Sequence, residues 1–263
     1  NLLYNFAPLY NLNKYKYHMK SLVIIPSRMS ATRLPGKPLL KINGKSIISH
    51  VFKRAERAEI GEVVVAAEDQ EIVNDVKKNG GNAILTSKFH KTGTDRIYEA
   101  LKLLNKKDID LIMNVQGDEP DIDIDDIRNL NLKMIINKSK IGTLAAKINN
   151  DKMYVNENIV KVKIKEILNQ NSFPLAENFM RDVKDQEKKN IYHHIGIYCY
   201  EAETLKKFIS LKQSKNELLN KLEQLRALDN NININVALAN KSPIGVDTEE
   251  DYLAIKKNMK YKL

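Results

Sequence analysis

The chain has 263 residues, enough to bury a full core without disulfides or structural metals. Its single cysteine, Cys199, excludes an internal disulfide and a cysteine-based zinc cluster, and no stretch approaches the roughly 20 apolar residues of a membrane span. The formal net charge of +10 comes mostly from lysines scattered along the chain, so we expect a solvated surface, no nucleic-acid or membrane binding, and a cytoplasmic location.

Residues 1–18 are rich in Asn and Tyr and show no periodicity, so we predict a poorly ordered extension or a misread start. From Ser21 onward, short apolar runs alternate with longer amphipathic stretches, which is typical of βα units around a mostly parallel sheet. Predicted strands cover residues 22–25, 62–66, 83–85, 111–115, 141–147 and 232–238. Predicted helices cover residues 47–58, 71–78, 96–104, 124–136, 202–209, 217–228 and 249–259. This pattern predicts a doubly wound α/β fold of the Rossmann-like type.

A region of about residues 151–200 breaks this rhythm. Residues 159–164 and 194–200 alternate apolar and polar side chains, as antiparallel strands do. We therefore predict one domain over residues 19–263 that carries an inserted, smaller antiparallel sheet.

The first predicted strand runs into a loop with three cations, Arg28, Arg33 and Lys37, and with bends set by Pro35 and Gly36. Such a loop at the carboxyl end of the first strand of an open sheet is suited to a ligand with several phosphates. Gly44-Lys45-Ser46 resembles the end of a Walker A loop, but the required earlier glycine is absent.

Residues 90–96 form a glycine-bearing loop that leads into a helix. Thr94 or Asp95 is predicted to cap this helix, and capping alone would explain both residues. The alternative is that Gly93, Thr94, Asp95 and Arg96 form a pocket for a polar planar ring, with exposed backbone groups, a hydroxyl and a guanidinium.

Two carboxylates are expected where a metal ion would contact the phosphate-bearing ligand. Asp118 follows a buried strand, and Asp247 lies just outside a predicted Thr248–Asp251 capping box. We predict that both point into one crevice and share a Mg²⁺ ion, which prefers hard oxygen ligands. Glu119 is predicted to be structural.

Further polar residues occur on the predicted helix over residues 217–228 and in the inserted sheet. Glu223 and Gln224 lie off the helix's leucine stripe and, with His194 and Tyr198, are suited to hydrogen bonds with a polyhydroxylated ligand. A purely structural helix and a buried structural histidine are the alternatives.

Six motifs in this order resemble the 3-deoxy-manno-octulosonate (Kdo) cytidylyltransferase family, also called CMP-Kdo synthetases. They cover residues 25–39, 90–96, 114–120, 194–198, 222–226 and 245–248. The resemblance implies a nucleotidyltransferase fold, usually a homodimer, and a Mg²⁺-dependent transfer of CMP from CTP to Kdo. Pyrophosphate is released, and the product serves lipopolysaccharide assembly.

The resemblance also implies roles for individual residues. Arg28, Arg33 and Lys37 would bind the CTP phosphates, and Arg28 and Lys37 would be catalytic together with the metal ligands Asp118 and Asp247. The loop Gly93, Thr94, Asp95 and Arg96 would lie near the cytosine and ribose. The Kdo pocket would be lined by Gln116, which also reaches CTP, and by His194, Tyr198, Glu223 and Gln224.

One departure concerns the acceptor. Gln170 stands where the family has an arginine suited to a sugar-acid charge, which permits a modified Kdo as substrate. The alternatives are a cytidylyltransferase for another acidic sugar, such as sialic acid, and a catalytically silent nucleotide- or nucleic-acid-binding protein.

Overall fold

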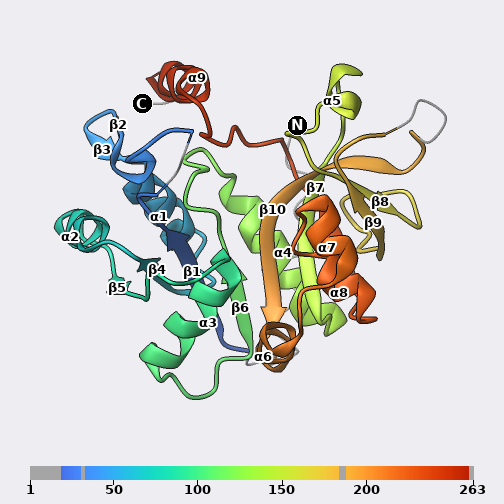
Figure 1. The fold of residues 1–263 in the computed structure, drawn as a ribbon, viewed down its shortest axis with the longest axis horizontal. Coiled ribbons are helices and arrows are strands. Elements are labelled where there is room, and N and C mark those ends of the chain that lie inside the picture. The colour runs from blue at the N-terminus through green and yellow to red at the C-terminus, as the bar shows by residue number, and fades with distance from the viewer. Residues whose placement is uncertain (1–18, 31–32, 184–187, 261–263) are drawn as a thin grey trace, which may run out of the picture.

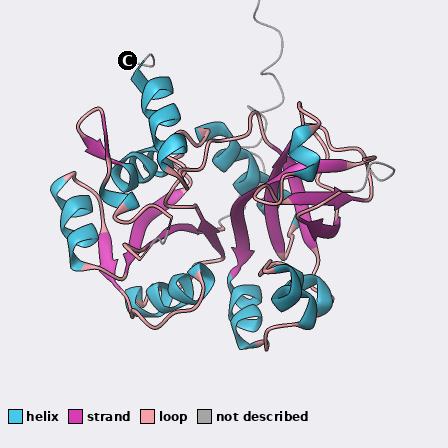
Figure 2. Cartoon of the chain, turned by 45° about the horizontal axis from the view of Figure 1, so that its top comes forward, coloured by secondary structure: helices cyan, strands magenta, loops and turns pink. Residues whose placement is uncertain are grey.

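The computed structural model describes residues 19–30, 33–183 and 188–260, so the predicted extension over residues 1–18 lies outside it. Within these residues the main sheet has nine strands, in the order β11-β7-β10-β6-β1-β4-β5, with β8 paired to β10 and β9 paired to β8. The strands run through the centre of the molecule with helices around them (Figures 1 and 2). The predicted α/β architecture is confirmed.

The strands of the main sheet are β1 (Ser21–Ser27), β4 (Gly61–Ala67), β5 (Ala83–Leu85), β6 (Leu111–Asn114), β7 (Ile141–Ala146), β8 (Lys161–Ile164), β9 (Ala176–Met180), β10 (Ile191–Glu201) and β11 (Ile234–Leu238). A separate hairpin joins β2 (Lys41–Ile42) and β3 (Lys45–Ser46). The helices are η2 (Lys37–Leu39), α1 (Ile47–Arg57), α2 (Gln70–Lys78), α3 (Gly93–Leu104), α4 (Ile124–Asn137), α5 (Lys152–Val155), α6 (Ala202–Ser210), α7 (Lys215–Asn220), α8 (Leu225–Asp229) and α9 (Glu249–Lys260).

Strand β1 separates two hydrophobic cores, because successive side chains of a strand point to opposite faces of the sheet. Val23 and Ile25 pack with the buried faces of α1, α2 and α4. Leu22 and Ile24 pack on the other side, with α3, α6 and α8. The continuous apolar run of β1 is thus explained by burial on both faces.

The strand directions place a crevice at the carboxyl ends of β1 and β6. Strand β1 is parallel to β4 on one side and to β6 on the other, and β10 lies antiparallel between β6 and β7. After β1 the chain continues to β4 on one side, whereas β6 lies on the opposite side of β1. The loops after β1 and after β6 therefore lead away from each other. Ligands of open α/β sheets bind at such a point.

The antiparallel region predicted at about residues 151–200 is present and is continuous with the main sheet. Its strands β8 and β9 pair with each other, and β8 also pairs with the first residues of β10. Strand β10 then continues between β6 and β7, with a register shift between Ile195 and Tyr198. One long strand therefore connects the inserted sheet to the crevice.

The single helix predicted over residues 217–228 is wrong. The chain forms α7 and α8 instead, because Lys221 adopts a left-handed backbone conformation with φ 52° and ends α7. Ser214 and Glu217 form a capping box that begins α7. The break places Glu223 and Gln224 in the turn between two short helices.

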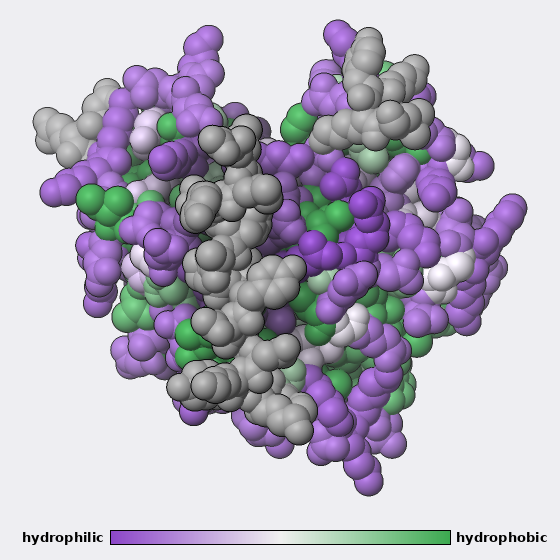
Figure 3. All heavy atoms as spheres, turned by 180° about the vertical axis from the view of Figure 1, so that it is seen from behind, coloured by the Kyte–Doolittle hydropathy of each residue, from purple (hydrophilic) through white to green (hydrophobic). Residues whose placement is uncertain are grey.

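The surface agrees with the lysine-rich composition. Hydrophilic side chains dominate the face seen in Figure 3, and apolar side chains appear there as smaller patches. Among the described residues, no helix is both long and apolar enough to cross a membrane.

Truncation of Leu22 tests the two-sided core. We expect Leu22→Ala, at a position with 0% exposure, to lower the free energy of unfolding by about 2–5 kcal/mol. The matched variant Leu253→Ala, at a position with 57% exposure, should change it by less than about 0.5 kcal/mol. Urea unfolding followed by circular dichroism measures both, and equal effects would contradict the assignment of Leu22 to the core.

Candidate active site

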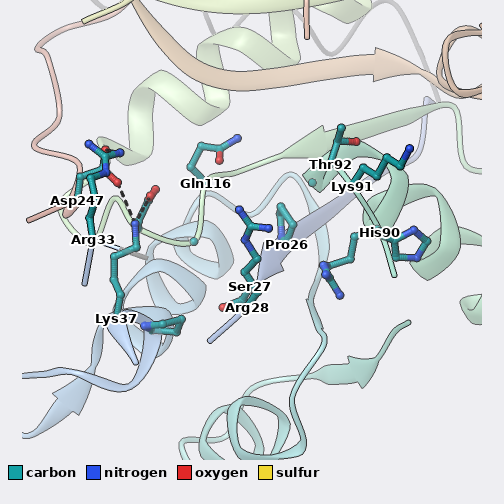
Figure 4. Close-up of a pocket in the computed structure, with 15 residues that line it drawn as sticks. Pro26, Ser27, Arg28, Arg33, Lys37, His90, Lys91, Thr92, Gln116 and Asp247 are labelled. Atoms are coloured by element: carbon teal, nitrogen blue, oxygen red, sulfur yellow. Dashed lines mark hydrogen bonds and ion pairs between the residues drawn. The ribbon is translucent and has the colours of Figure 1, made fainter. Parts of the chain in front are cut away.

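A cavity of about 330 Å³ opens at the carboxyl ends of β1 and β6. Its walls come from the loop after β1, the loop before α3, the loop after β6 and the segment before α9. The lining residues are Pro26, Ser27, Arg28, Arg33, Lys37, Pro38, His90, Lys91, Thr92, Gly93, Arg96, Gln116, Gly117, Asp118 and Asp247. Figure 4 shows Lys37 and Asp247 on one side, His90 and Lys91 on the other, and Arg28 and Gln116 between them.

The backbone before η2 turns Lys37 into this cavity. Gly36 has φ 70°, in the left-handed region that favours glycine, and Pro38 follows at the start of the short helix. The Lys37 side chain is only 14% exposed. The predicted role of Pro and Gly in shaping this loop is therefore visible as a specific conformation at Gly36.

The ammonium of Lys37 lies between two carboxylates from distant parts of the chain. Its Nζ is 2.8 Å from Asp118 Oδ2 and 3.2 Å from Asp247 Oδ1, as the dashed lines in Figure 4 show. Burial alone lowers the pKa of Lys37, but the two carboxylates outweigh burial and raise it above its usual value. Lys37 is therefore charged and offsets the repulsion between Asp118 and Asp247.

Asp247 also meets a second cation, and its backbone is fixed beside Asp118. Arg33 Nη2 lies 3.0 Å from Asp247 Oδ2. The amide of Val246 donates to the carbonyl of Asp118 at 2.9 Å, which joins the two carboxylate-bearing segments directly. The predicted capping box after Asp247 is confirmed, because Thr248 Oγ1 accepts from the amide of Asp251 while Asp251 Oδ2 accepts from the amide of Thr248.

Glu119 is the neutral member of this acidic region. Burial, together with the nearby charges of Asp118 and Asp247, raises its pKa to about 8. A protonated Glu119 adds no third negative charge at neutral pH.

The loop before α3 is organised by Thr92. Helix α3 begins at Gly93, and Thr92 forms a capping box with Asp95: the Asp95 amide donates to Thr92 Oγ1 at 3.1 Å, and the Thr92 amide donates to Asp95 Oδ2 at 3.2 Å. The prediction that Thr94 or Asp95 caps the helix was therefore wrong, although Asp95 is half of the capping box. Thr92 and Gly93 line the cavity, whereas Thr94 and Asp95 do not.

Arg96 lines the cavity wall, but its guanidinium is occupied within the protein. It is 3% exposed, and it donates to Glu68 Oε2 at 2.5 Å and to Thr86 Oγ1 at 2.7 Å. The other oxygen of Glu68 accepts from Ser30 Oγ at 2.9 Å, so the pair also holds the start of the cationic loop. Arg96 thus fixes the cavity's shape through Glu68.

Gln116 and Gly117 bring the loop after β6 against its neighbours. Gln116 Nε2 donates to the carbonyl of Gly196, at the register shift of β10, at 2.8 Å. A Cβ atom on Gly117 would lie 2.8 Å from the carbonyl oxygen of Pro26, so any side chain there would collide with the end of β1. These contacts place Gln116 between β10 and the cationic loop.

Of the five residues predicted for a sugar site, Gln116 lines this cavity, whereas the other four lie outside its lining. His194 and Tyr198 come from β10, and both rings are buried and 5.5 Å apart between centroids. Glu223 Oε2 accepts from Thr94 Oγ1 at 2.7 Å, and Gln224 follows at the start of α8. The Tyr198 hydroxyl and Glu223 Oε1 are buried without a hydrogen-bond partner among the described residues.

Burial shifts the pKa values of Glu223 and His194. It raises the pKa of Glu223 and lowers that of His194 to about 3, with His193 adding to the latter shift. Thr143 Oγ1 donates to the carbonyl of Ile197 at 2.7 Å and lies 3.0 Å from His194 Nε2. A neutral His194 therefore donates from Nε2 to Thr143.

The sequence motifs included some lining residues without assigning them a role. His90 and Lys91 open the motif of residues 90–96, and Ser27 directly precedes Arg28. Their place beside the predicted residues is the signal that would have identified them. Gln170, the departure noted above, is exposed, and its amide lies 3.5 Å from Asn240 Oδ1.

Known proteins are similar to this chain over most of its length. The cytidylyltransferase family model matches residues 22–234. A 3-deoxy-manno-octulosonate cytidylyltransferase of Brucella canis is 42% identical over 241 residues, covering 89% of this chain and 93% of that protein.

Two solved structures are similar. A CMP:2-keto-3-deoxy-manno-octonic acid synthetase complexed with CTP superposes with a TM-score of 0.83 at 33% identity, covering 93% of this chain and all of that one. A cytidylyltransferase from Leptospira borgpetersenii has a TM-score of 0.61 at 20% identity, covering 94% of this chain and 89% of that one, and so shares the fold.

The buried state of His194 predicts a pH dependence. The pKa of His194 is about 3 in the folded protein and 6.5 in the unfolded chain. Its contribution to the free energy of unfolding is therefore complete above pH 6.5 and is lost as the pH falls toward 3. In an NMR titration, the His194 ring signals should therefore stay constant from about pH 8 to pH 5. The variant His194→Gln identifies those signals, and a midpoint near 6.5 would contradict the buried assignment.

Proposed function

The chain belongs to the 3-deoxy-manno-octulosonate cytidylyltransferase family, and from this premise we propose that it transfers CMP from CTP to the anomeric hydroxyl of Kdo. The observation that carries the proposal is the position of Lys37, charged and held between Asp118 and Asp247 at the mouth of the sheet crevice. A triphosphate needs cations and a metal ion in one place; this cavity supplies the cations, and Asp118 and Asp247 would hold the metal.

The reaction is a displacement at the α-phosphorus of CTP. The anomeric oxygen of Kdo forms a bond to this phosphorus, the bond to pyrophosphate breaks, and the hydroxyl proton is released. No covalent enzyme intermediate is needed, so positioning and charge stabilisation account for catalysis.

Arg28, Arg33 and Lys37 hold the phosphates in this proposal. Each charge-assisted hydrogen bond to a phosphate oxygen contributes about 1.5–3 kcal/mol. Arg28 lines the cavity beside the end of β1 and forms no ion pair among the described residues, so its guanidinium is available for the ligand. Arg33 and Lys37 are paired with Asp247 and exchange that contact for phosphate when the nucleotide binds.

Asp118 and Asp247 are the proposed ligands of Mg²⁺. Two carboxylates that already share one cation suit this ion, which keeps several waters and takes further oxygens from substrate phosphates. No group of three or more His, Cys, Asp and Glu side chains in the described part of the chain is arranged for a metal ion. When bound, Mg²⁺ supplies neutralisation of charge on the phosphoryl oxygens.

The nucleoside and the sugar occupy opposite sides of Gln116. We assign the cytosine and ribose to the loop of Gly93, where Thr94, Asp95 and Arg96 support the loop from within. The Kdo site comprises Gln116, His194, Tyr198, Glu223 and Gln224. The buried Tyr198 hydroxyl, which has no hydrogen-bond partner among the described residues, supports this assignment, because buried polar atoms normally have partners.

The wider setting follows from the family resemblance. We propose that the protein acts as a homodimer in the cytoplasm and that its product serves lipopolysaccharide assembly. A modified Kdo is a second candidate acceptor, because the exposed amide of Gln170 provides no charge for a carboxylate.

Pyrophosphate release tests the proposed reaction. With CTP and Mg²⁺, we expect turnover with Kdo or its 8-amino analogue and much less with sialic acid. The ratio of kcat/KM between the first two identifies the acceptor. No release with any 3-deoxy sugar acid would refute the proposal, and an RNA mobility shift without CTP turnover would favour a binding protein.

Asp118→Asn tests the metal ligand. We expect kcat/KM to fall by at least about a hundredfold, because an amide cannot replace the carboxylate charge beside the transferring phosphate. Asp125→Asn is the matched control, since Asp125 is an exposed carboxylate of α4 that pairs with Arg128 and should be almost without effect. Wild-type turnover by a folded Asp118→Asn enzyme would remove Asp118 from the metal site.

A further inference from the structure

The segment between β11 and α9 carries Asp247 but has little regular structure of its own. Three consecutive residues hold its first part, each through a different element. The Asn240 amide donates to Asp126 Oδ1 in α4 at 2.8 Å, Lys241 Nζ donates to Asp121 Oδ2 at 2.9 Å, and Ser242 Oγ lies 2.9 Å from His193 Nδ1 in β10.

Asp121 is the central member of these contacts. It is 9% exposed, and each of its carboxylate oxygens meets a different cation: Oδ1 lies 2.7 Å from Arg54 Nη2 in α1, and Oδ2 lies 2.9 Å from Lys241 Nζ. Arg54 also donates to the carbonyl of Ile122 at 3.1 Å, which fixes the same turn a second time. One buried carboxylate thus joins a helix, the loop after β6 and the segment before α9.

This ionic contact lies close in sequence to both proposed metal ligands. Asp121 is three residues after Asp118, and Lys241 is six residues before Asp247. Between them, the amide of Val246 donates to the carbonyl of Asp118. The Asp121–Lys241 ion pair and this backbone bond join the same two segments at separate points.

We propose that Asp121 and Lys241 are positioning residues that set the relative placement of Asp118 and Asp247 for a divalent cation. The proposal rests on the proposed function for the identity of these two carboxylates as metal ligands. Neither Asp121 nor Lys241 lines the cavity, so they act through the segments that they join.

A purely electrostatic role and a positioning role of Lys241 predict opposite effects of its removal on cation binding. Removal of a positive charge near a cation site strengthens cation binding by simple Coulomb attraction. Removal of the contact that holds Asp247 in place weakens it, because outer contacts orient the ligands of a metal. The sign of the change at Lys241 therefore separates the two explanations.

The test measures Mn²⁺ as a spectroscopic probe, by electron paramagnetic resonance, in the full chain with CTP present. We expect Lys241→Met to weaken Mn²⁺ binding about tenfold and to raise the Mg²⁺ concentration needed for half-maximal turnover by a similar factor. Asp121→Asn should weaken binding at least as much, and the double variant should be no worse than Asp121→Asn alone because the two residues share one contact.

Lys140→Met is the matched control. Lys140 also forms an ion pair, with Glu201 Oε1 at 2.7 Å, but it lies before β7 at the other end of the sheet. This variant should leave Mn²⁺ binding unchanged, and thermal unfolding should show that Lys241→Met remains folded even if Asp121→Asn does not.

Unchanged or stronger Mn²⁺ binding by Lys241→Met would overturn the proposal. A wild-type protein without an Asp118-dependent Mn²⁺ signal would overturn it together with the metal site. A wild-type protein that shows this signal but releases no pyrophosphate would overturn the proposed reaction alone, and the effect of Lys241→Met on Mn²⁺ binding would still decide the positioning role.

Discussion

The contact of Lys37 with Asp118 and Asp247 is the interaction on which the arrangement of the site depends. Two carboxylates at one place repel each other and resist ionisation unless a cation compensates for them. Lys37 provides that cation from the loop after β1, while the carboxylates come from the loop after β6 and from the segment before α9. Three segments separated by much of the sequence therefore meet at one ammonium group.

The charged groups that the structure describes around this contact add no unpaired negative charge to it. Glu119, next to Asp118, is buried with its pKa raised to about 8 and so contributes no charge at neutral pH. Arg96 is neutralised by Glu68, and through Ser30 the same pair holds the loop that leads to Arg33 and Lys37. Among the described residues no ion pair engages Arg28, whereas Arg33, Lys37 and Arg96 each pair with a carboxylate.

Local patterns predicted most of the fold and the outline of the site. The apolar run of β1 and the cationic loop after it are adjacent in sequence, and the sheet rules place the end of β6 beside them. The ion pair of Arg96 and the capping role of Thr92 were not predictable in this way, because the first depends on Glu68 and the second on the exact start of α3. The break at Lys221 was also missed, since a lysine in a left-handed conformation leaves no compositional signal comparable to glycine.

The first turn of α3 connects the two sides of the proposed site. Gly93 lines the cavity, and a Cβ atom there would lie 3.4 Å from Pro26 Cγ at the end of β1. Thr94, the next residue, points away and donates to Glu223 on the proposed sugar side. Adjacent residues of one helical turn therefore set the distance between the cationic loop and the proposed acceptor site. Because transfer requires the acceptor oxygen in line with the α-phosphorus, this turn provides a geometric constraint that neither side could supply alone.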